Sequence, residues 1–351
     1  MIGSKSTKSI ESLRESFREK FFSKSSTSTI SESEREDPLT SHIFSPACLP
    51  MAEFTRKFRL LETIGEGSSA VVHRCEEIGS GKIWAAKITR PRNEEVCDAL
   101  RKEVSGMKRL SHQNVIHFEE VFADDSQNVY LSLMEFALGE DLLHHINRKR
   151  FLQSREAKTV FFRILQGLRY LHSHSVVHRD LKAANIRVSK DLSLVKIIDF
   201  NVARIGTRRR SFETQVQDLL MGSLTGSPDI RAPEMLSRKL YGKEVDMWAA
   251  GCLLVQILTG TKAFDSKAEH ADQSMIDQSL AERLQEHFRL HKEKVSEEAA
   301  DLIGRLLTVD PCQRMTAEQA LNHPWLRKER KMSSEIEVKK PVLLSLEDLP
   351  E

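Results

Sequence analysis

The chain has 351 residues, of which 40% are hydrophobic, so it can form two or three ordinary domains or one large two-part domain with a sizeable core. Its 53 basic and 51 acidic residues give a net charge of +2, which argues against the strong positive field of nucleic-acid and membrane-surface binders. No window has the apolar length of a signal peptide or a membrane span. We therefore expect no nucleic-acid partner and no transmembrane segment.

The five cysteines are an odd number and lie far apart, without CxxC or zinc-ligand spacing. This pattern predicts free thiols in a reducing compartment, and neither disulfides nor structural zinc. We expect a cytoplasmic and/or nuclear location.

Residues 1–56 are rich in Ser, Thr, Lys and Glu, a composition that predicts a disordered tail. One apolar stripe recurs within it at three- and four-residue spacing: Ile10, Leu13, Phe17 and Phe21. The stripe predicts an amphipathic helix near residues 9–22. Such a helix packs on the globular part of its own chain, forms only as a nascent helix, or docks to a partner or a membrane.

Short alternating apolar runs begin at Phe58 and predict strands joined by Gly- and Ser-bearing turns, followed by a helical pattern that ends near Met107. Beyond Gly139 the apolar stretches are mostly helical. The fold class is therefore α+β in two lobes, with a ligand site between them. We assign the parts as a small β-rich N-lobe over 57–137, a larger α-helical C-lobe over 138–326 and a charged tail over 327–351.

The first motif with chemical meaning is IGEGSSAVV at residues 64–72. Gly65 and Gly67 allow backbone N–H groups to approach phosphates closely, and Val72 can cover a flat base. A plain hairpin turn explains the same residues equally well. Lys87 follows at the end of WAAK, where a buried ammonium needs a carboxylate, and Glu103 on the next helical pattern is the candidate partner.

The stretch HRDLKAAN is more specific, because it places Asp180, Lys182 and Asn185 in one loop. Asp199 follows an apolar strand in KIIDF. Oxygens of Asn185 and Asp199 can hold Mg²⁺, and Asp180 can orient an attacking hydroxyl.

Taken in order from Phe58 to Leu326, the motifs resemble those of eukaryotic protein kinases. They are GEGSSAVV, WAAK, Glu103, HRDLKAAN, DF, RAPE, DMWAAGC and Arg314 in DPCQRMT. Lys182 in the catalytic loop resembles the serine/threonine type, and ALNHPWL is similar to the calmodulin-dependent kinase group. The resemblance implies a protein-kinase-like bilobal fold and transfer of the γ-phosphate of ATP to Ser/Thr hydroxyls of protein substrates, with Mg²⁺.

The same resemblance implies a role for each site residue. Lys87 would hold the α/β-phosphates and pair with Glu103, and Asp180 would be the catalytic base. Lys182 would steady the γ-phosphate, while Asn185 and Asp199 would bind magnesium. The nucleotide would be bound by Ile64, Gly65, Glu66, Gly67, Val72, Ala85, Lys87, Met134, Glu135, Ala137, Asp141, Arg187 and Asp199. Glu234 with Arg314 would form a structural ion pair, and Asp246 would anchor the catalytic loop.

Three positions depart from the family pattern. Ala70 replaces the third glycine of the phosphate loop, and Asn201 replaces the glycine after DF. Arg187 stands where an apolar residue usually forms the floor beneath adenine. An active kinase is the main interpretation because all the chemically active residues are present. A pseudokinase that acts as a scaffold or allosteric regulator is the alternative, given Asn201 and Arg187.

The segment between Asp199 and Glu234 contains hydroxyl residues that predict regulation of the activity by phosphorylation. By resemblance, Ser227 bridges Asp180 and Lys182, and Ser223 is the activating phosphorylation site. Arg179 would clamp that phosphate. Thr225 is the nearby alternative, and Ser211 is a second, self-directed candidate.

Overall fold

The computed structural model describes residues 48–67, 70–90, 107–124, 126, 128–205, 226–237, 241–264, 282, 286, 289–291 and 293–329. All of them belong to one compact unit, residues 45–351. Several predictions fall outside these ranges: the tail helix near 9–22, Glu103, Ser211, Ser223, Thr225 and the tail beyond residue 329.

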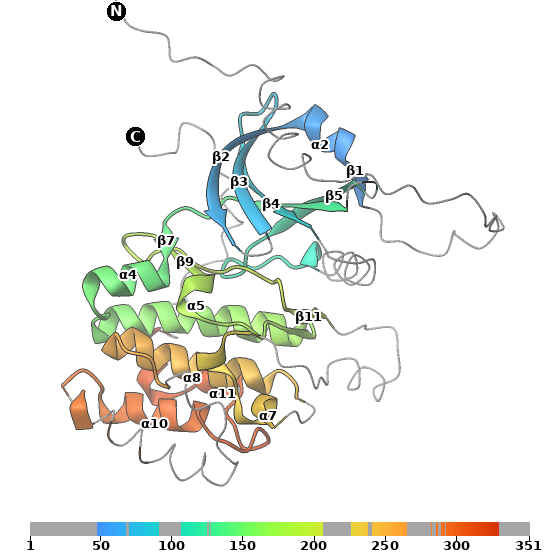
Figure 1. The fold of residues 1–351 in the computed structure, drawn as a ribbon. Helices are drawn as coiled ribbons and strands as arrows, with labels where there is room; N and C mark the ends of the chain where they lie inside the picture. Colours follow the sequence, from blue (N-terminus) through green and yellow to red (C-terminus); the bar gives the residue numbers. More distant parts are fainter. Residues whose placement is uncertain are drawn as a thin grey trace, which may run out of the picture. The chain divides into compact units, whose positions relative to one another are not determined.

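A six-stranded sheet forms the first lobe, in the order β1-β5-β6-β4-β3-β2 (Figure 1). Its strands are β1 (Leu49–Pro50), β2 (Phe58–Glu66), β3 (Ala70–Glu77), β4 (Ile83–Thr89), β5 (Phe118–Asp124) and β6 (Val129–Glu135). Neighbouring strands are antiparallel except β1, which runs parallel to β5. The sheet places β4, which ends shortly after Lys87, between β3 and β6.

The structure differs from the predicted tail at residues 48–56, where β1 and helix α2 (Met51–Lys57) belong to the first lobe. Phe54 of α2 is buried, with its ring centroid 5.4 Å from that of Phe58 and 5.3 Å from that of Phe122. The polar composition of the preceding residues hides this anchor, because the burial of Phe54 depends on its contact with Phe122, which lies far away in the sequence.

Helices dominate the second lobe. They are α4 (Leu142–Lys149), α5 (Ser154–Ser173), α7 (Pro233–Leu236), α8 (Glu244–Thr259), α10 (Glu297–Leu306) and α11 (Ala317–Leu321), with the 3₁₀ turns η2 (Ala183–Asn185), η3 (Pro228–Ile230) and η5 (Pro324–Leu326). Helix α5 begins with a capping box, in which Gln153 N donates to Glu156 Oε2 at 3.1 Å. Helix α8 is buried on nearly every side, as expected of a helix that is apolar all round.

Two small sheets in this lobe position the loops described below. Strand β9 (Ile186–Val188) pairs with both β10 (Val195–Ile197) and β7 (Glu140–Asp141). Strand β8 (Val176–Val177) pairs with β11 (Arg204–Ile205). Because β8 and η2 flank residues 178–182, both ends of that loop are fixed. The predicted α+β class, with a β-rich first lobe and a helical second lobe, is confirmed.

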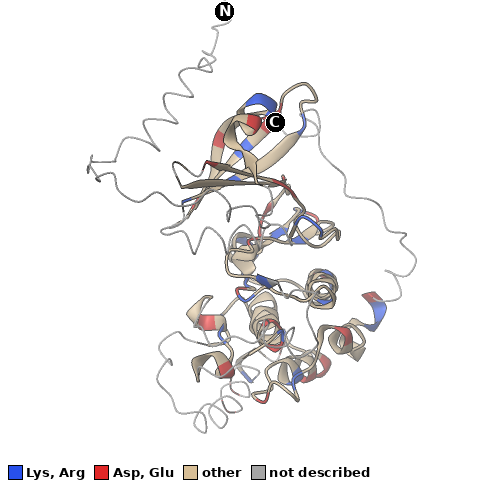
Figure 2. Cartoon of the chain, turned by 90° about the vertical axis from the view of Figure 1, so that its right-hand side faces the viewer, with Lys and Arg blue, Asp and Glu red and all other residues tan. Residues whose placement is uncertain are grey.

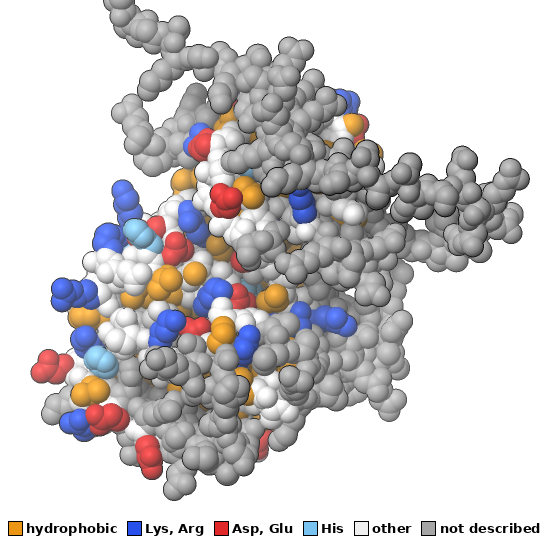
Figure 3. All heavy atoms as spheres, in the orientation of Figure 1, with side chains coloured by type: hydrophobic (Ala, Val, Ile, Leu, Met, Phe, Trp, Pro, Cys, Tyr) orange, Lys and Arg blue, Asp and Glu red, His pale blue; other side chains and the backbone are white. Residues whose placement is uncertain are grey.

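Charged residues of both signs are interspersed along the described chain (Figure 2). On the face shown in Figure 3, hydrophobic side chains lie in small groups between charged ones. Across the described ranges, we find no helix that is both long and apolar enough to cross a membrane. Cys75, Cys252 and Cys312 are free thiols, and burial raises the pKa of Cys75 to about 12.

Candidate active site

The carboxylate of Asp180 is held from three sides. It accepts hydrogen bonds from Lys182 Nζ at 2.8 Å, from Asn185 Nδ2 at 3.0 Å and from the backbone N–H of Ser227 at 2.8 Å. Lys182 Nζ also donates to Ser227 Oγ at 2.7 Å, which is the bridge expected of Ser227. Burial opposes the charged form, but the contacts with Lys182 and Ser227 hold the pKa of Asp180 below its usual range. This carboxylate is therefore ionised at neutral pH and can accept a hydrogen bond from a hydroxyl.

The loop that carries Asp180 is anchored to the buried Asp246 in the first turn of α8. Asp246 accepts from His178 N at 2.9 Å, from Arg179 N at 2.8 Å and from His172 Nε2 at 2.9 Å. Burial alone would raise the pKa of Asp246, but the hydrogen bond and charge of His172 lower it more. The anchor predicted for Asp246 is thus present, and its acceptor oxygens fix the backbone just before Asp180.

The sheet of the first lobe aligns three predicted residues in one cross-strand row. Gly65 of β2 pairs with Val72 of β3, which pairs with Lys87 of β4. Lys87 Nζ donates to Asp199 Oδ1 at 2.6 Å and also to Asn201 Oδ1. A lysine and an aspartate that are 112 residues apart thus lie in direct contact, whereas Glu103, the expected partner of Lys87, is outside the described residues.

The apolar residues predicted for the nucleotide site share one cluster. Ala85 and Met134 are register neighbours on β4 and β6 and are both buried, while Val72 and Ala137 are half-buried against the same core. Ile64 is 45% exposed, and Gly65 and Glu66 complete β2. Gly67 N donates to Ala70 O at 2.9 Å, which closes the turn between β2 and β3.

Glu135 has a partner that the sequence analysis missed. Its buried carboxylate accepts from Lys196 Nζ at 2.5 Å and from His117 N at 3.2 Å. Lys196 lies in β10 within the apolar run VKI, and a lysine in such a run indicates a buried charge that needs an acid.

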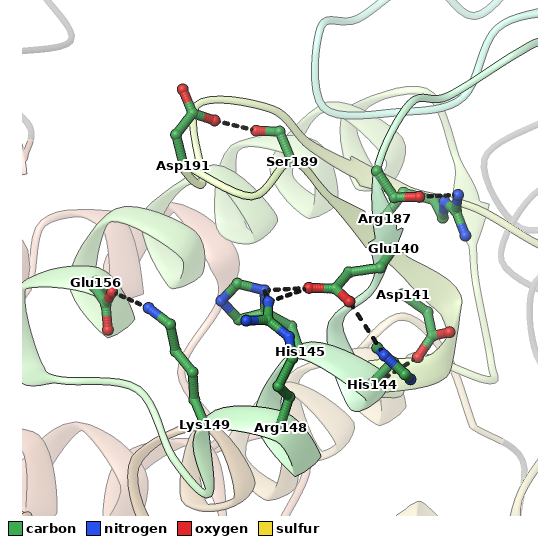
Figure 4. Close-up of polar contacts among 11 residues, drawn as sticks. Glu140, Asp141, His144, His145, Arg148, Lys149, Glu156, Arg187, Ser189 and Asp191 are labelled. Carbon is green, nitrogen blue, oxygen red and sulfur yellow. Dashed lines mark hydrogen bonds and ion pairs between the residues drawn. The ribbon is translucent and has the colours of Figure 1, made fainter. Parts of the chain in front are cut away.

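Arg187 lies on β9 directly opposite Asp141 on β7, and its guanidinium donates to the backbone carbonyl of Gly139 (Figure 4). Burial lowers the pKa of Arg187, and the nearby charges of Asp141 and Glu140 oppose that shift. In the part of the chain that the structure describes, neither carboxylate forms an ion pair with the Arg187 guanidinium. The cost of the partly buried cation is therefore offset by one carbonyl and by these two nearby charges.

The two acids beside Arg187 have partners of their own (Figure 4). Glu140 accepts from His145 Nδ1 at 2.7 Å and from Arg148 at 2.6 Å. Asp141 caps α4 by accepting from His144 N at 2.7 Å. Asp141 is thus placed by its capping role, at the junction between β7 and α4.

The structural ion pair predicted between Glu234 and Arg314 is present and buried. Arg314 donates to both carboxylate oxygens of Glu234, at 2.6 and 2.9 Å. Its other N–H groups donate to the backbone carbonyls of Thr308, Glu244 and Val309. Such a bidentate contact fixes α7, and with it the turn that carries Ser227.

Gly226 is the one position where this turn requires glycine. Its φ is +73°, and a Cβ there would lie 2.4 Å from Arg179 O. Gly226→Ala should therefore destabilise the protein by about 1–3 kcal/mol, measured by urea unfolding. Gly304→Ala is the matched control, because nothing lies within 4 Å of its Cβ position in α10 and alanine is the better helix former. Equal stability of the two variants would contradict the backbone strain predicted for alanine at residue 226.

The family model of the protein kinase domain matches residues 58–326. The chain belongs to the protein kinase family. This kinase chain is 34% identical over 272 residues to "Serine/threonine-protein kinase H1" of Mus musculus, covering 78% of this chain and 62% of the relative.

Two further relatives carry calmodulin-dependent names. "Calcium/calmodulin-dependent protein kinase type IV" of Mus musculus is 33% identical over 282 residues, covering 79% of this chain and 55% of the relative. "Calcium/calmodulin-dependent protein kinase cmkB" of Emericella nidulans is 34% identical over 279 residues, covering 77% and 65%. The resemblance to serine/threonine kinases and to the calmodulin-dependent group is confirmed. The matched part spans less than two thirds of each relative's length.

Proposed function

We propose that this protein kinase transfers the γ-phosphate of ATP to serine or threonine hydroxyls of protein substrates. The observation that carries the proposal is the ionised Asp180 carboxylate, oriented by Lys182, Asn185 and Ser227. Phosphoryl transfer needs positioning and charge compensation more than covalent chemistry, and this arrangement supplies both. The similarity to relatives named serine/threonine kinases supports the class of acceptor.

In the proposed reaction, Asp180 orients the acceptor hydroxyl and takes its proton. Lys182 lies 2.8 Å from the same carboxylate and would contact the γ-phosphate on its other side. Lys87 would bind the α/β-phosphates, with Glu103 as its additional expected partner. The adenine would lie against the cluster of Ala85, Met134, Val72 and Ala137, with the remaining predicted nucleotide contacts around it.

The residues present fit a magnesium ion. Asn185 donates through Nδ2 to Asp180, so its Oδ1 is the acceptor side of the amide, and Asp199 adds a carboxylate. Among the described residues no group of three or more His, Cys, Asp or Glu side chains could hold a metal alone. Magnesium typically takes one or two protein oxygens together with substrate phosphates and waters, which suits Asn185 and Asp199. When bound, the ion would neutralise charge on the phosphates.

The scaffold alternative has little support from the two departures that prompted it. The guanidinium of Arg187 donates to the backbone carbonyl of Gly139, so this cation is accommodated without a change in the kinase fold. The replacement of glycine by Asn201 does not prevent the contact between Asp199 and Lys87. The relatives found are named as kinases. The active enzyme therefore remains the proposal.

The test is a transfer assay with the purified full chain, γ-labelled ATP, magnesium and a mixed protein substrate. We expect label on phosphoserine or phosphothreonine after acid hydrolysis. Nucleotide binding without any transfer, on added proteins or on the chain itself, would contradict the proposal and favour a scaffold.

Three further predictions accompany this function. We propose a cytoplasmic or nuclear location from the cysteine pattern. Docking through residues 9–22 and activation by phosphate on Ser223, or on Thr225 or Ser211, remain predictions on residues outside the described ranges. In the described structure, the guanidinium of Arg179 donates to the backbone carbonyls of Val202 and Ala203, next to the start of that segment.

A further inference from the structure

Asn201 shares the ammonium group of Lys87 with Asp199. Lys87 Nζ donates to Asp199 Oδ1 at 2.6 Å and to Asn201 Oδ1. The side chain of Lys87 is only 14% exposed, so its charge needs acceptors close by. An ammonium has three N–H donors, and two of them are directed to acceptors on one short segment.

That segment is held on both sides of Asn201. Phe200 is buried, with ring centroids 6.0 Å from Phe118 and 4.8 Å from His178. The guanidinium of Arg179 donates to the two backbone carbonyls that follow Asn201. The amide oxygen is therefore presented to Lys87 from a fixed piece of backbone.

We propose that Asn201 is a positioning residue, which fixes the direction of the Lys87 ammonium for the phosphates of a bound nucleoside di- or triphosphate. The inference rests on the proposed ATP site. With these two acceptors in place among the described residues, the direction of the remaining N–H of Lys87 is restricted, and we expect it to be shared between a phosphate oxygen and Glu103. A phosphate oxygen in that direction is bound without reorganisation of the lysine.

The contribution of Asn201 should depend on magnesium. A cation bound at Asp199 competes with Lys87 for the negative charge of that carboxylate. The neutral amide of Asn201 is a weaker ligand for magnesium, so it keeps its contact with the ammonium. Asn201 should therefore contribute more to ADP affinity in magnesium than in EDTA.

The experiment compares the full chain with Asn201→Ala and Asn201→Gly by calorimetric titration with ADP, in EDTA and in magnesium. Asn201 has no positive φ, so alanine does not strain the backbone. Losing one hydrogen bond to a charged group should weaken ADP binding about tenfold in magnesium, and less in EDTA. In the transfer assay, KM for ATP should rise more than kcat falls. Asn322→Ala, which removes a surface amide that contacts Glu318, is the matched control.

The outcomes separate the inference from the proposed function. If the unchanged protein binds no ADP or ATP, the proposed nucleotide site is wrong and the inference with it. If the unchanged protein binds nucleotide and both Asn201 variants bind it as tightly as the unchanged protein, the inference alone is overturned. A loss of melting temperature with unchanged ADP affinity also overturns it, because that result describes a structural role only.

Discussion

Asp199→Ala should abolish phosphate transfer, with a loss of about a thousandfold or more, since charge compensation dominates this reaction. The substitution removes the carboxylate that contacts Lys87 at 2.6 Å and that we propose as a magnesium ligand. It should also remove the enhancement of nucleotide binding by magnesium, while the fold persists. The measurements are the labelled-ATP assay and ADP titrations with and without the metal.

Asp191→Ala is the matched control for this prediction. Asp191 is an exposed aspartate between β9 and β10, and hydrogen bonds from Ser189 and Ser193 hold its pKa at about 2. Its loss should leave transfer unchanged, because its hydrogen-bond partners among the described residues, Ser189 and Ser193, lie in its own turn. Full activity of Asp199→Ala would refute the proposed metal site.

Arg314→Met should lower the free energy of unfolding by about 3–5 kcal/mol, because it leaves the carboxylate of Glu234 buried without its partner. The loss also frees three backbone carbonyls that now accept from the guanidinium. Urea unfolding followed by tryptophan fluorescence measures the change.

Arg305→Met provides the comparison for Arg314→Met. Arg305 pairs with Asp301 one turn away on the exposed face of α10, and such surface pairs contribute about 1 kcal/mol or less.

In a double-mutant cycle, Glu234→Gln combined with Arg314→Met should lower the free energy of unfolding by less than the sum of the single changes. Additive losses would mean that the two side chains are not energetically coupled.

The sequence was most informative where several chemically distinct residues stand at fixed spacing in one loop. The HRDLKAAN stretch predicted the neighbourhood of Asp180, Lys182 and Asn185, because residues this close in the chain must meet once the loop is anchored. The two lobes were predicted equally well, since strand and helix periodicities differ. The resemblance then supplied the pair of Glu234 and Arg314, which no spacing rule could give.

Contacts between distant residues that the family resemblance does not imply could not be predicted from the sequence. The sharing of Lys87 by Asp199 and Asn201 depends on how residue 87 of a strand meets a turn more than a hundred residues later. The pair of Glu135 and Lys196 was missed for the same reason, although a lysine in an apolar strand was a visible sign. The assignment of residues 48–56 to the tail was wrong because local composition cannot register the burial of Phe54.

The pairing of β1 with β5 has a consequence for the aggregation of shortened forms of this kinase. The family match begins at Phe58, but β1 occupies the outer edge of the sheet beside β5. A chain that begins at residue 58 would present the unpaired backbone N–H and carbonyl groups of β5 as a template for strands of other molecules. It would also uncover the aromatic ring of Phe122, which Phe54 now covers. We therefore expect a chain that begins at residue 58 to aggregate more readily than one that retains Leu49 and Pro50.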